Sequence, residues 1–362
     1  MQPSHLRRLS GAVAISLVIA ACSSAATPVP TRAPTAAPSA GATTAASPTA
    51  TPLPGTKTFT VGFTNPGISS APFLAAIADL NTKGYKIDSP VIQSSELVVQ
   101  GVASGSFAFG SGANNAVLAA VEQGAQIRVV VTRVNNEWTL YAAKSITSCA
   151  GLAGKKLAIH SEGAVSTAMV KNYIATKCKG TVPNYVVIPG SENRLQALLA
   201  NPSPIDASPL ELGDAVTVDL KAADRYSILS NFAADLPNLQ ANAIYVNLAF
   251  ARDNPGSVVD LIKAVLEQYR KVDGNAAYLQ QISEAQVPNA IVKDTVAAAS
   301  KKFVDLKMFP VNGGLTTENL TYSAKFFGPA PDGIGATKTV VPLANWTDLT
   351  YLNLALAAIG KK

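Results

Sequence analysis

Histidine and cysteine are scarce in this sequence, which has two histidines and three cysteines among 362 residues. His5 lies in an N-terminal segment that we expect to be removed, so His160 is the one histidine left for chemistry. A serine-hydrolase elbow, Gly-x-Ser-x-Gly, is missing, and so are the Cys-x-x-Cys pairs and Cys/His clusters typical of zinc sites. We therefore expect neither a catalytic site nor a metal site, and we interpret His160 as a structural or rim residue.

Phosphate-binding loops are missing as well. No Gly-x-Gly-x-x-Gly or Walker pattern occurs, and "GLAGKK" has the wrong glycine spacing and precedes a strand instead of following one. We expect no cofactor.

Charge of one sign is nowhere concentrated. Removing Arg7 and Arg8 with the N-terminal segment leaves 27 of the 29 basic residues against 23 acidic ones, a formal charge of +4. The excess is spread along the chain without a dense Lys/Arg block, so nucleic acid is not an expected partner.

The N-terminal apolar run is too short to cross a membrane. It extends from Leu9 to Ala21 behind two arginines, whereas a spanning helix needs about 20 apolar residues. This is the layout of a secretory signal peptide over residues 1–21. The next residues, "IAAC", resemble the lipobox of bacterial lipoproteins, in which the cysteine, here Cys22, becomes the lipid-bearing N-terminus. The alternative is ordinary cleavage near Ala21.

Aromatic residues are missing from the segment that follows. Residues 22–56 consist almost wholly of Ala, Thr, Pro and Ser, with Arg32 as the one charge. Such a composition cannot bury enough apolar surface to offset chain entropy, which predicts a disordered stalk. A generic linker without an anchor remains the alternative.

Two cysteines remain after Cys22. An exported chain meets oxidising conditions, so a Cys149–Cys178 disulfide is the default expectation, with two buried thiols as the alternative.

From Lys57 onward, strand-like and helix-like segments alternate. "KTFTVGF" alternates as a strand does, "APFLAAIADLNTKG" reads as a helix, and "IRVVVTRV" is a β-branched run of the kind that parallel sheets bury. The alternation begins again at Leu152, and a returning strand near residues 241–246 leads into a long helix started by Pro255. Short loops between such segments indicate an α/β fold, and the length suggests two lobes.

Three stretches resemble the substrate-binding proteins of ABC importers, in particular the nitrate, sulfonate, taurine and thiamine-precursor type. They are residues 96–130, "GLAGKKLAIHSEGAVSTAMVKNYI" and "RLQALLANPSPIDASPLE". Ala108 stands where that family usually has an aspartate, and "NPSP" replaces its usual glycine, so the ligand is left open.

The resemblance implies a periplasmic-binding-protein-like (type II), two-lobe Venus-flytrap fold. The first lobe would comprise residues 57–143 and 231–362, and the second residues 144–230. The protein would be an extracytoplasmic, membrane-anchored lipoprotein, a monomer that delivers a small molecule to an ABC permease.

Ligands of open α/β sheets bind beyond the carboxyl ends of the strands, where helix N-termini present free N–H groups. Three glycine-bearing loops have that placement: "TNPGISS", "GSGANN" and "SEGAVST". Plain βα turns are the alternative for each. The candidate ligand-binding residues are Asn65, Ser69, Ser70, Ser111, Asn114, Arg133, Asn136, Trp138, Ser161, Ser166 and Glu192.

Helix N-termini and Arg133 favour an anionic ligand such as a sulfonate, nitrate or a carboxylate, and a pyrimidine-type molecule is also compatible. Two other functions stay open. One is an enzyme that resembles the pyrimidine-precursor synthases, which share this fold. The other is a ligand-sensing domain held at the cell surface by the stalk.

Overall fold

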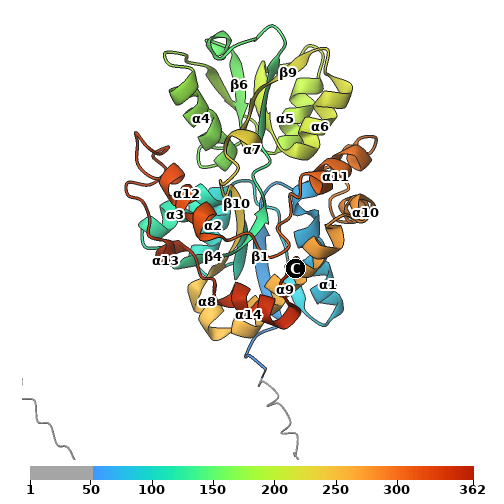
Figure 1. The fold of residues 1–362 in the computed structure, drawn as a ribbon, viewed down its shortest axis with the longest axis vertical. Coiled ribbons are helices and arrows are strands. Elements are labelled where there is room, and N and C mark those ends of the chain that lie inside the picture. Colours follow the sequence, from blue (N-terminus) through green and yellow to red (C-terminus); the bar gives the residue numbers. More distant parts are fainter. Residues whose placement is uncertain (1–51) are drawn as a thin grey trace, which may run out of the picture. The chain divides into compact units, whose positions relative to one another are not determined.

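Two five-stranded sheets organise residues 52–362, the part of the chain that the structure, a computed structural model, describes. These residues belong to one compact unit. The expected signal peptide, Cys22 and the stalk up to residue 51 lie outside the described residues. In Figure 1 one sheet carries the labels β1, β4 and β10, and the other carries β6 and β9.

The first sheet has the strand order β2-β1-β3-β10-β4. β1, β2 and β3 pair in parallel, whereas β10 runs antiparallel to both β3 and β4. Its centre consists of apolar residues covered on both faces, as in β4, where every residue except Arg128 is buried. The strands are β1 (Thr58–Phe63), β2 (Lys86–Asp88), β3 (Phe109–Ala113), β4 (Ile127–Val134) and β10 (Asn242–Asn247).

The second sheet has the order β7-β6-β8-β5-β9. β6 pairs in parallel with β7 and β8, and β5 runs antiparallel to β8 and β9. The strands are β5 (Thr139–Ala143), β6 (Lys156–Ile159), β7 (Asn184–Val187), β8 (Ala207–Leu210) and β9 (Tyr226–Asn231).

Both crossings between the sheets join carboxyl edges. β4 ends at Val134 and β5 begins at Thr139; β9 ends at Asn231 and β10 begins at Asn242. The strand that enters each sheet is the antiparallel one, so its first residue lies at the edge where the parallel strands end. The loops that follow the parallel strands of both sheets therefore meet around the crossings.

The first crossing differs from the boundary expected between residues 143 and 144. β5 hydrogen-bonds to β8 and β9, which places Thr139–Ala143 in the second sheet. The chain leaves the first sheet within residues 135–138.

Helices cover the sheets (Figure 1). α9 begins with Pro255 at a position where the missing N–H costs nothing, and it buries Val258, Leu261, Ile262 and Val265 at helical spacing. In the first lobe the helices before the crossing are η1 (Ile68–Ser70), α1 (Ala71–Thr82), α2 (Ser95–Ala103) and α3 (Asn114–Glu122). The second lobe has η2 (Cys149–Leu152), α4 (Val165–Lys177), α5 (Ser191–Leu199) and α6 (Leu212–Lys221), and α7 (Phe232–Asp235) lies in the return crossing.

The C-terminal third is mostly helical, as expected. α11 packs against α6 of the second lobe, so the tail contacts both lobes. Its helices are α8 (Leu248–Asp253), α9 (Pro255–Val272), α10 (Ala276–Gln286), α11 (Val296–Asp305), α12 (Thr317–Phe327), α13 (Leu343–Trp346) and α14 (Thr350–Ile359). In the described range, no helix combines the length and the apolar character needed to cross a membrane.

The end of the expected stalk is attached to the first lobe. The Gly256 N–H donates to the Pro54 carbonyl at 2.8 Å, and the Thr56 N–H donates to Asn254 Oδ1 at 3.0 Å. Residues 54–56 are therefore held at the start of α9. The predicted disordered stalk, residues 22–56, extends too far toward the C-terminus by these residues.

Cys149 and Cys178 are joined by a disulfide, with their Cα atoms 5.1 Å apart. Cys149 begins η2 ahead of β6, and Cys178 caps α4. The disulfide therefore links the C-terminal end of α4, which follows β6, to η2, which precedes β6.

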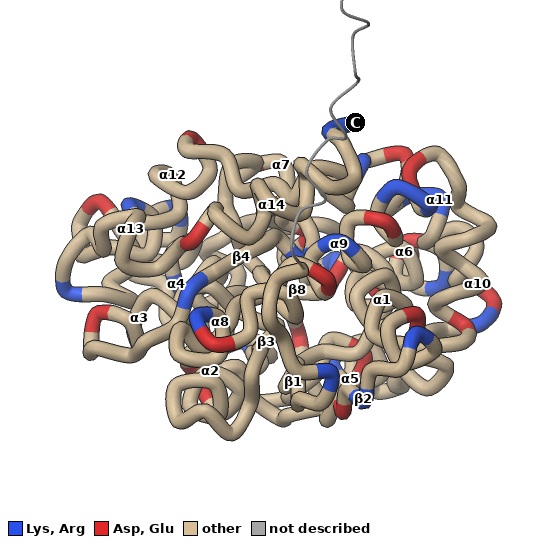
Figure 2. The backbone as a smooth tube through the Cα atoms, turned by 90° about the horizontal axis from the view of Figure 1, so that it is seen from below, with Lys and Arg blue, Asp and Glu red and all other residues tan. Residues whose placement is uncertain are grey.

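Lys and Arg are interspersed with Asp and Glu over the molecule in Figure 2. This agrees with the even spread of charge in the sequence.

Candidate functional site

Polar side chains gather where the two sheets present their carboxyl edges to each other. Thr64 follows β1, Asn114 follows β3, His160 follows β6 and Glu211 follows β8, and all four are buried. Because both crossings lie at these edges, one region between the lobes receives side chains from both sheets.

Many polar atoms in this region are buried without a hydrogen-bond partner. Buried polar groups in proteins are normally hydrogen-bonded, so a cluster of unpartnered ones calls for an explanation. At the strand ends and crossings they belong to Asn65, Ser111, Asn114, Arg133, Asn136, Glu137, Trp138, His160, Ser166, Thr167, Arg194, Glu211 and Asn242.

Seven of the eleven residues expected at the site lie at this edge and are buried, or half-buried for Asn65. Arg133 lies inside β4 and donates from Nη1 to the Thr64 carbonyl at 3.2 Å, while its Nε and Nη2 have no partner. Ser69 donates to Glu211 Oε2 at 3.5 Å, which joins the first lobe to the second. The seven are Asn65, Ser69, Ser111, Asn114, Arg133, Trp138 and Ser166.

The other four expected residues have local or bridging contacts. Ser70 exchanges hydrogen bonds with Gly67 inside its own loop. Asn136 donates to the Phe232 carbonyl at 2.7 Å and so links the two crossings. Ser161 donates to Glu96 across the lobes at 3.2 Å. Glu192 is half-buried in the first turn of α5, and burial raises the pKa of its carboxyl.

Sequence reasoning missed three buried charged residues at the site: Glu137, Arg194 and Glu211. Glu137 lies in the first crossing and is 1% exposed; Glu211 immediately precedes α6 and is 5% exposed. Arg194 lies on α5 at 0% exposure, and its guanidinium is 5.8 Å from the centre of the Trp138 ring. One available signal was overlooked: Glu211 is the polar residue directly after a buried strand.

Burial dominates the electrostatics of the carboxyl groups. Desolvation raises the pKa of Glu137 to about 7 against the lowering effect of Arg133. Desolvation also raises the pKa of Glu211 well above its ordinary value, and the charge of Glu137 adds to this. The pKa of Asp214, half-buried at the start of α6, is raised to about 7 by burial. The site therefore carries more buried acid than its two arginines neutralise.

Those two arginines form no ion pair with the carboxylates. Within residues 52–362, no ion pair within 4.0 Å includes Arg133, Arg194, Glu137 or Glu211. Arg194 instead donates to the carbonyls of Pro209 at 3.0 Å and Ile188 at 3.1 Å. Buried charges are ordinarily paired, so the arrangement leaves the carboxylates and the guanidinium of Arg133 with unused bonding capacity.

His160 is buried and neutral. Its Nδ1 accepts from the Gly190 N–H at 2.9 Å, and desolvation and the charge of Arg194 lower its pKa to about 4. The imidazole thus presents Nε2–H as a donor, a structural or binding role instead of that of a base at neutral pH.

Direct contacts hold the lobes together on both flanks of the site. On one flank Glu96 accepts from the Gly163 N–H at 2.7 Å, and Asn115 donates to the Gly163 carbonyl at 2.7 Å. On the other flank the hydroxyls of Thr217 and Thr295 lie 2.7 Å apart, and Lys221 pairs with Asp294 at 2.7 Å. The structure therefore shows the lobes in contact around the buried cluster.

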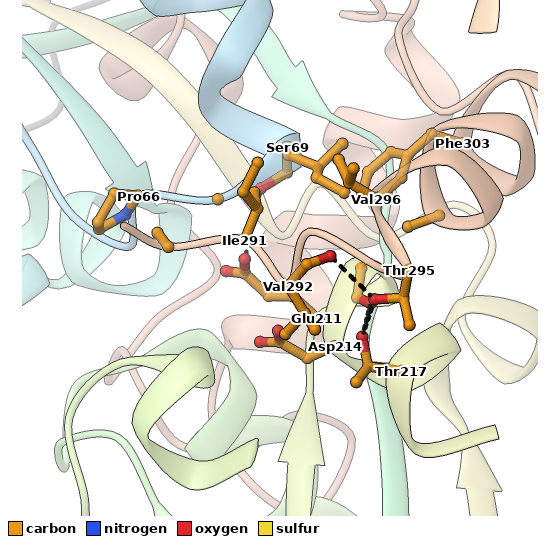
Figure 3. A pocket seen from close by; sticks show the side chains of 15 residues that line it. Pro66, Ser69, Glu211, Asp214, Thr217, Ile291, Val292, Thr295, Val296 and Phe303 are labelled. Atoms are coloured by element: carbon orange, nitrogen blue, oxygen red, sulfur yellow. Dashed lines mark hydrogen bonds between the residues drawn. The ribbon is translucent and has the colours of Figure 1, made fainter. Parts of the chain in front are cut away.

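Figure 3 shows Ser69 and Glu211 beside a small cavity that also touches Asp214 and Thr217. Its volume is about 20 Å³, little more than one water molecule needs. Glu137 and Leu212 line a separate pocket of about 200 Å³ that reaches α11. The start of α6 lies between the two spaces.

A larger pocket, of about 810 Å³, lies between α2 and α3 of the first lobe, α4 of the second and residues 330–336. Three charged side chains line it: Glu96 is already engaged by the 161–163 turn, and Lys171 and Glu162 are exposed and paired with each other. Of the residues that line this pocket, Asn115 has one buried atom without a partner, its Oδ1. Most such atoms lie at the strand ends and crossings, so we place the candidate site there. In residues 52–362 no three metal-ligating side chains are gathered together.

Solved structures with the same architecture are numerous. A protein of Bordetella bronchiseptica RB50 superposes with a TM-score of 0.70 at 16% identity over 84% of this chain and 99% of the other. The periplasmic nitrate-binding protein NrtA from Synechocystis PCC 6803 has a TM-score of 0.62 at 13% identity, with coverages of 85% and 90%. The alkanesulfonate-binding protein SsuA from Xanthomonas axonopodis pv. citri, bound to MOPS, has a TM-score of 0.56 at 13% identity, with coverages of 75% and 91%. At these identities the likeness shows the fold, which is the expected periplasmic-binding-protein fold.

No curated protein matches the sequence. The family model described as "NMT1/THI5 like" matches residues 84–273, which is more than half of the chain and includes the crossings and the second lobe. The chain therefore belongs to the NMT1/THI5-like family.

Proposed function

We propose that this protein is the solute-binding component of an ABC import system and captures a small polar molecule between its lobes. One observation carries the proposal: buried polar and charged side chains from both lobes converge at the strand ends without partners. A ligand that supplies those partners makes the closed arrangement favourable.

The flanking contacts give closure a mechanism. The Glu96–Gly163 and Thr217–Thr295 hydrogen bonds form only when the lobes meet, and closure also buries Glu137 and Glu211. Without a ligand, the gain from the contacts is offset by the desolvation of charges. With a ligand the charges are matched, so binding shifts the equilibrium between the open and closed forms.

A thermal-shift screen of the mature protein tests this function. We expect at least one class among small sulfonates, carboxylates, nitrate, pyrimidines and amines to raise the melting temperature in proportion to the logarithm of its concentration, because a ligand stabilises the state that it binds. Small-angle scattering with the same compound should show a smaller radius of gyration. A flat response to every class contradicts the proposal.

The mature protein is proposed to be an extracytoplasmic lipoprotein that works with a membrane permease. The "IAAC" sequence, the Ala/Thr/Pro/Ser stalk and the Cys149–Cys178 disulfide support this localisation.

Cys22→Ala is expected to abolish lipid modification and to move the protein from the membrane fraction to the soluble fraction, since the thiol is the acylation site. Intact-mass measurement of the wild-type protein should show the added acyl groups, and Cys22→Ala should lack them. An unmodified wild-type mass rules out the anchor and leaves solute binding in place.

A further inference from the structure

Glu137 and Glu211 are two carboxylates at one site, brought together from different parts of the chain. Glu137 belongs to the first crossing, and Glu211 stands at the start of α6 in the second lobe. Both oxygens of Glu137 and Oε1 of Glu211 are buried without hydrogen-bond partners. Ser69 and the Leu212 N–H face Glu137 and favour its ionised form, but neither makes a full hydrogen bond to it. The pair therefore offers three buried oxygens to a bound group.

Few positive charges surround the pair: Arg133, Arg194 and, on α11, Lys302, which lines the pocket beside Glu137. Asp214 on α6 and Glu192 on α5 add negative charge, and His160 is neutral. Arg133 on β4 acts on both members of the pair without an ion pair to either, and Arg194 on α5 is engaged with two backbone carbonyls. The partial positive charge at the N-terminus of α6 favours Glu211, yet burial and the neighbouring acids outweigh it.

Two spaces lie beside the start of α6, one at each member of the pair. Glu211 lines the small cavity of about 20 Å³ in Figure 3, and Glu137 lines the pocket of about 200 Å³. The pKa values of both carboxyls are already raised, and an oxyanion against these oxygens would oppose their ionisation further. A protonated nitrogen would donate hydrogen bonds to both carboxylates and neutralise their charge.

On the basis of the proposed function, we propose that the bound solute carries a cationic nitrogen group, an ammonium or amidinium, held between Glu137 and Glu211. An acceptor group elsewhere on the solute would meet the free Nε–H and Nη2–H of Arg133. The site thus selects an organic cation or zwitterion over a simple oxyanion. This differs from the anionic ligand that the helix N-termini and Arg133 favour in the sequence.

Matched pairs of probes that differ by one nitrogen group test the proposal. The pairs are taurine with ethanesulfonate, β-alanine with propionate, and 4-aminopyridine with pyridine, measured by calorimetry and thermal shift alongside nitrate. The nitrogen-bearing member should bind at least tenfold more tightly. Glu137→Gln and Glu211→Gln should each remove most of that difference, whereas Glu284→Gln, an exposed matched control on α10, should retain it.

Proton linkage provides a second measurement that needs no variant. At pH 7 the nitrogen-bearing probe should release protons from the pair on binding and should bind more tightly at pH 8 than at pH 6. Tight binding of nitrate, ethanesulfonate or propionate that is unaffected by both glutamine variants overturns this inference and leaves the proposed function intact. Failure of every probe here and in the broader screen contradicts both.

Discussion

Glu137→Gln is expected to stabilise the ligand-free protein by about 3 kcal/mol at pH 8 and to change little at pH 4.5. Burial raises the pKa of Glu137 from 4.5 to about 7, and each unit of difference between the folded and unfolded states corresponds to about 1.4 kcal/mol. The folded protein must hold this carboxylate ionised at pH 8. Glutamine has the same shape without that charge.

The pH dependence has a definite sign. Between pH about 4.5 and 7 the folded protein retains a proton on Glu137 that the unfolded chain has lost, so its stability falls as pH rises. His160 acts in the opposite direction between pH about 4 and 6.5, because its pKa is lowered on folding. Subtracting Glu137→Gln from wild type cancels the His160 contribution.

Urea denaturation followed by circular dichroism at several pH values between 4.5 and 8 gives the free energy of unfolding of each protein. Glu284→Gln, the exposed control, should follow the wild type throughout. A Glu137→Gln effect of the same size at pH 4.5 and pH 8 would show that packing, and not the buried charge, causes it.

Local sequence pattern was sufficient for much of the fold. β4 coincides with the β-branched run "IRVVVTRV", and α9 starts at the expected Pro255. Both signals are local, namely side-chain shape in a covered strand and a ring that fits the first helical turn. The alternation of strands and helices gave the α/β layers for the same reason.

Local sequence pattern does not predict which strands pair with each other. "TLYAA" is an apolar strand in either sheet, and only its hydrogen bonds to β8 and β9, which occur more than sixty residues later in the chain, assign it to the second sheet. The antiparallel insertion of β10 between β3 and β4 is likewise non-local.

The residues of the candidate site likewise divide into those that local sequence pattern identifies and those that depend on distant contacts. Small polar residues after strands, such as Ser69 and Asn114, were found because the strand ends are visible in the sequence. Glu137 and Arg194 were missed because a charged residue in a polar stretch resembles a solvated one. Their burial arises from the packing of distant segments, through the crossing for Glu137 and beneath Trp138 for Arg194.

Arg194→Met is expected to lower the free energy of unfolding by about 2 to 6 kcal/mol, because each of two buried acceptors that loses a donor costs about 1 to 3 kcal/mol. The methionine leaves the carbonyls of Ile188 and Pro209 without their donors. It also removes the positive charge that lowers the pKa values of Asp214 and Glu192. Since those acids then resist ionisation further, the loss should be larger at pH 8 than at pH 5.

Two substitutions separate the causes. Arg194→Lys keeps the charge but loses the planar fork that reaches both carbonyls, so we expect roughly half the loss with little pH dependence. Arg252→Met replaces an arginine whose side chain is 74% exposed, and it should change stability by less than about 0.5 kcal/mol. Equal losses for Arg194→Met and Arg194→Lys would assign the role of Arg194 to its hydrogen bonds alone. If Arg194→Met loses no more stability than Arg252→Met, the ionisation of Asp214 and Glu192 does not depend on Arg194. The unmatched charge at the site would then lie on Glu137 and Glu211.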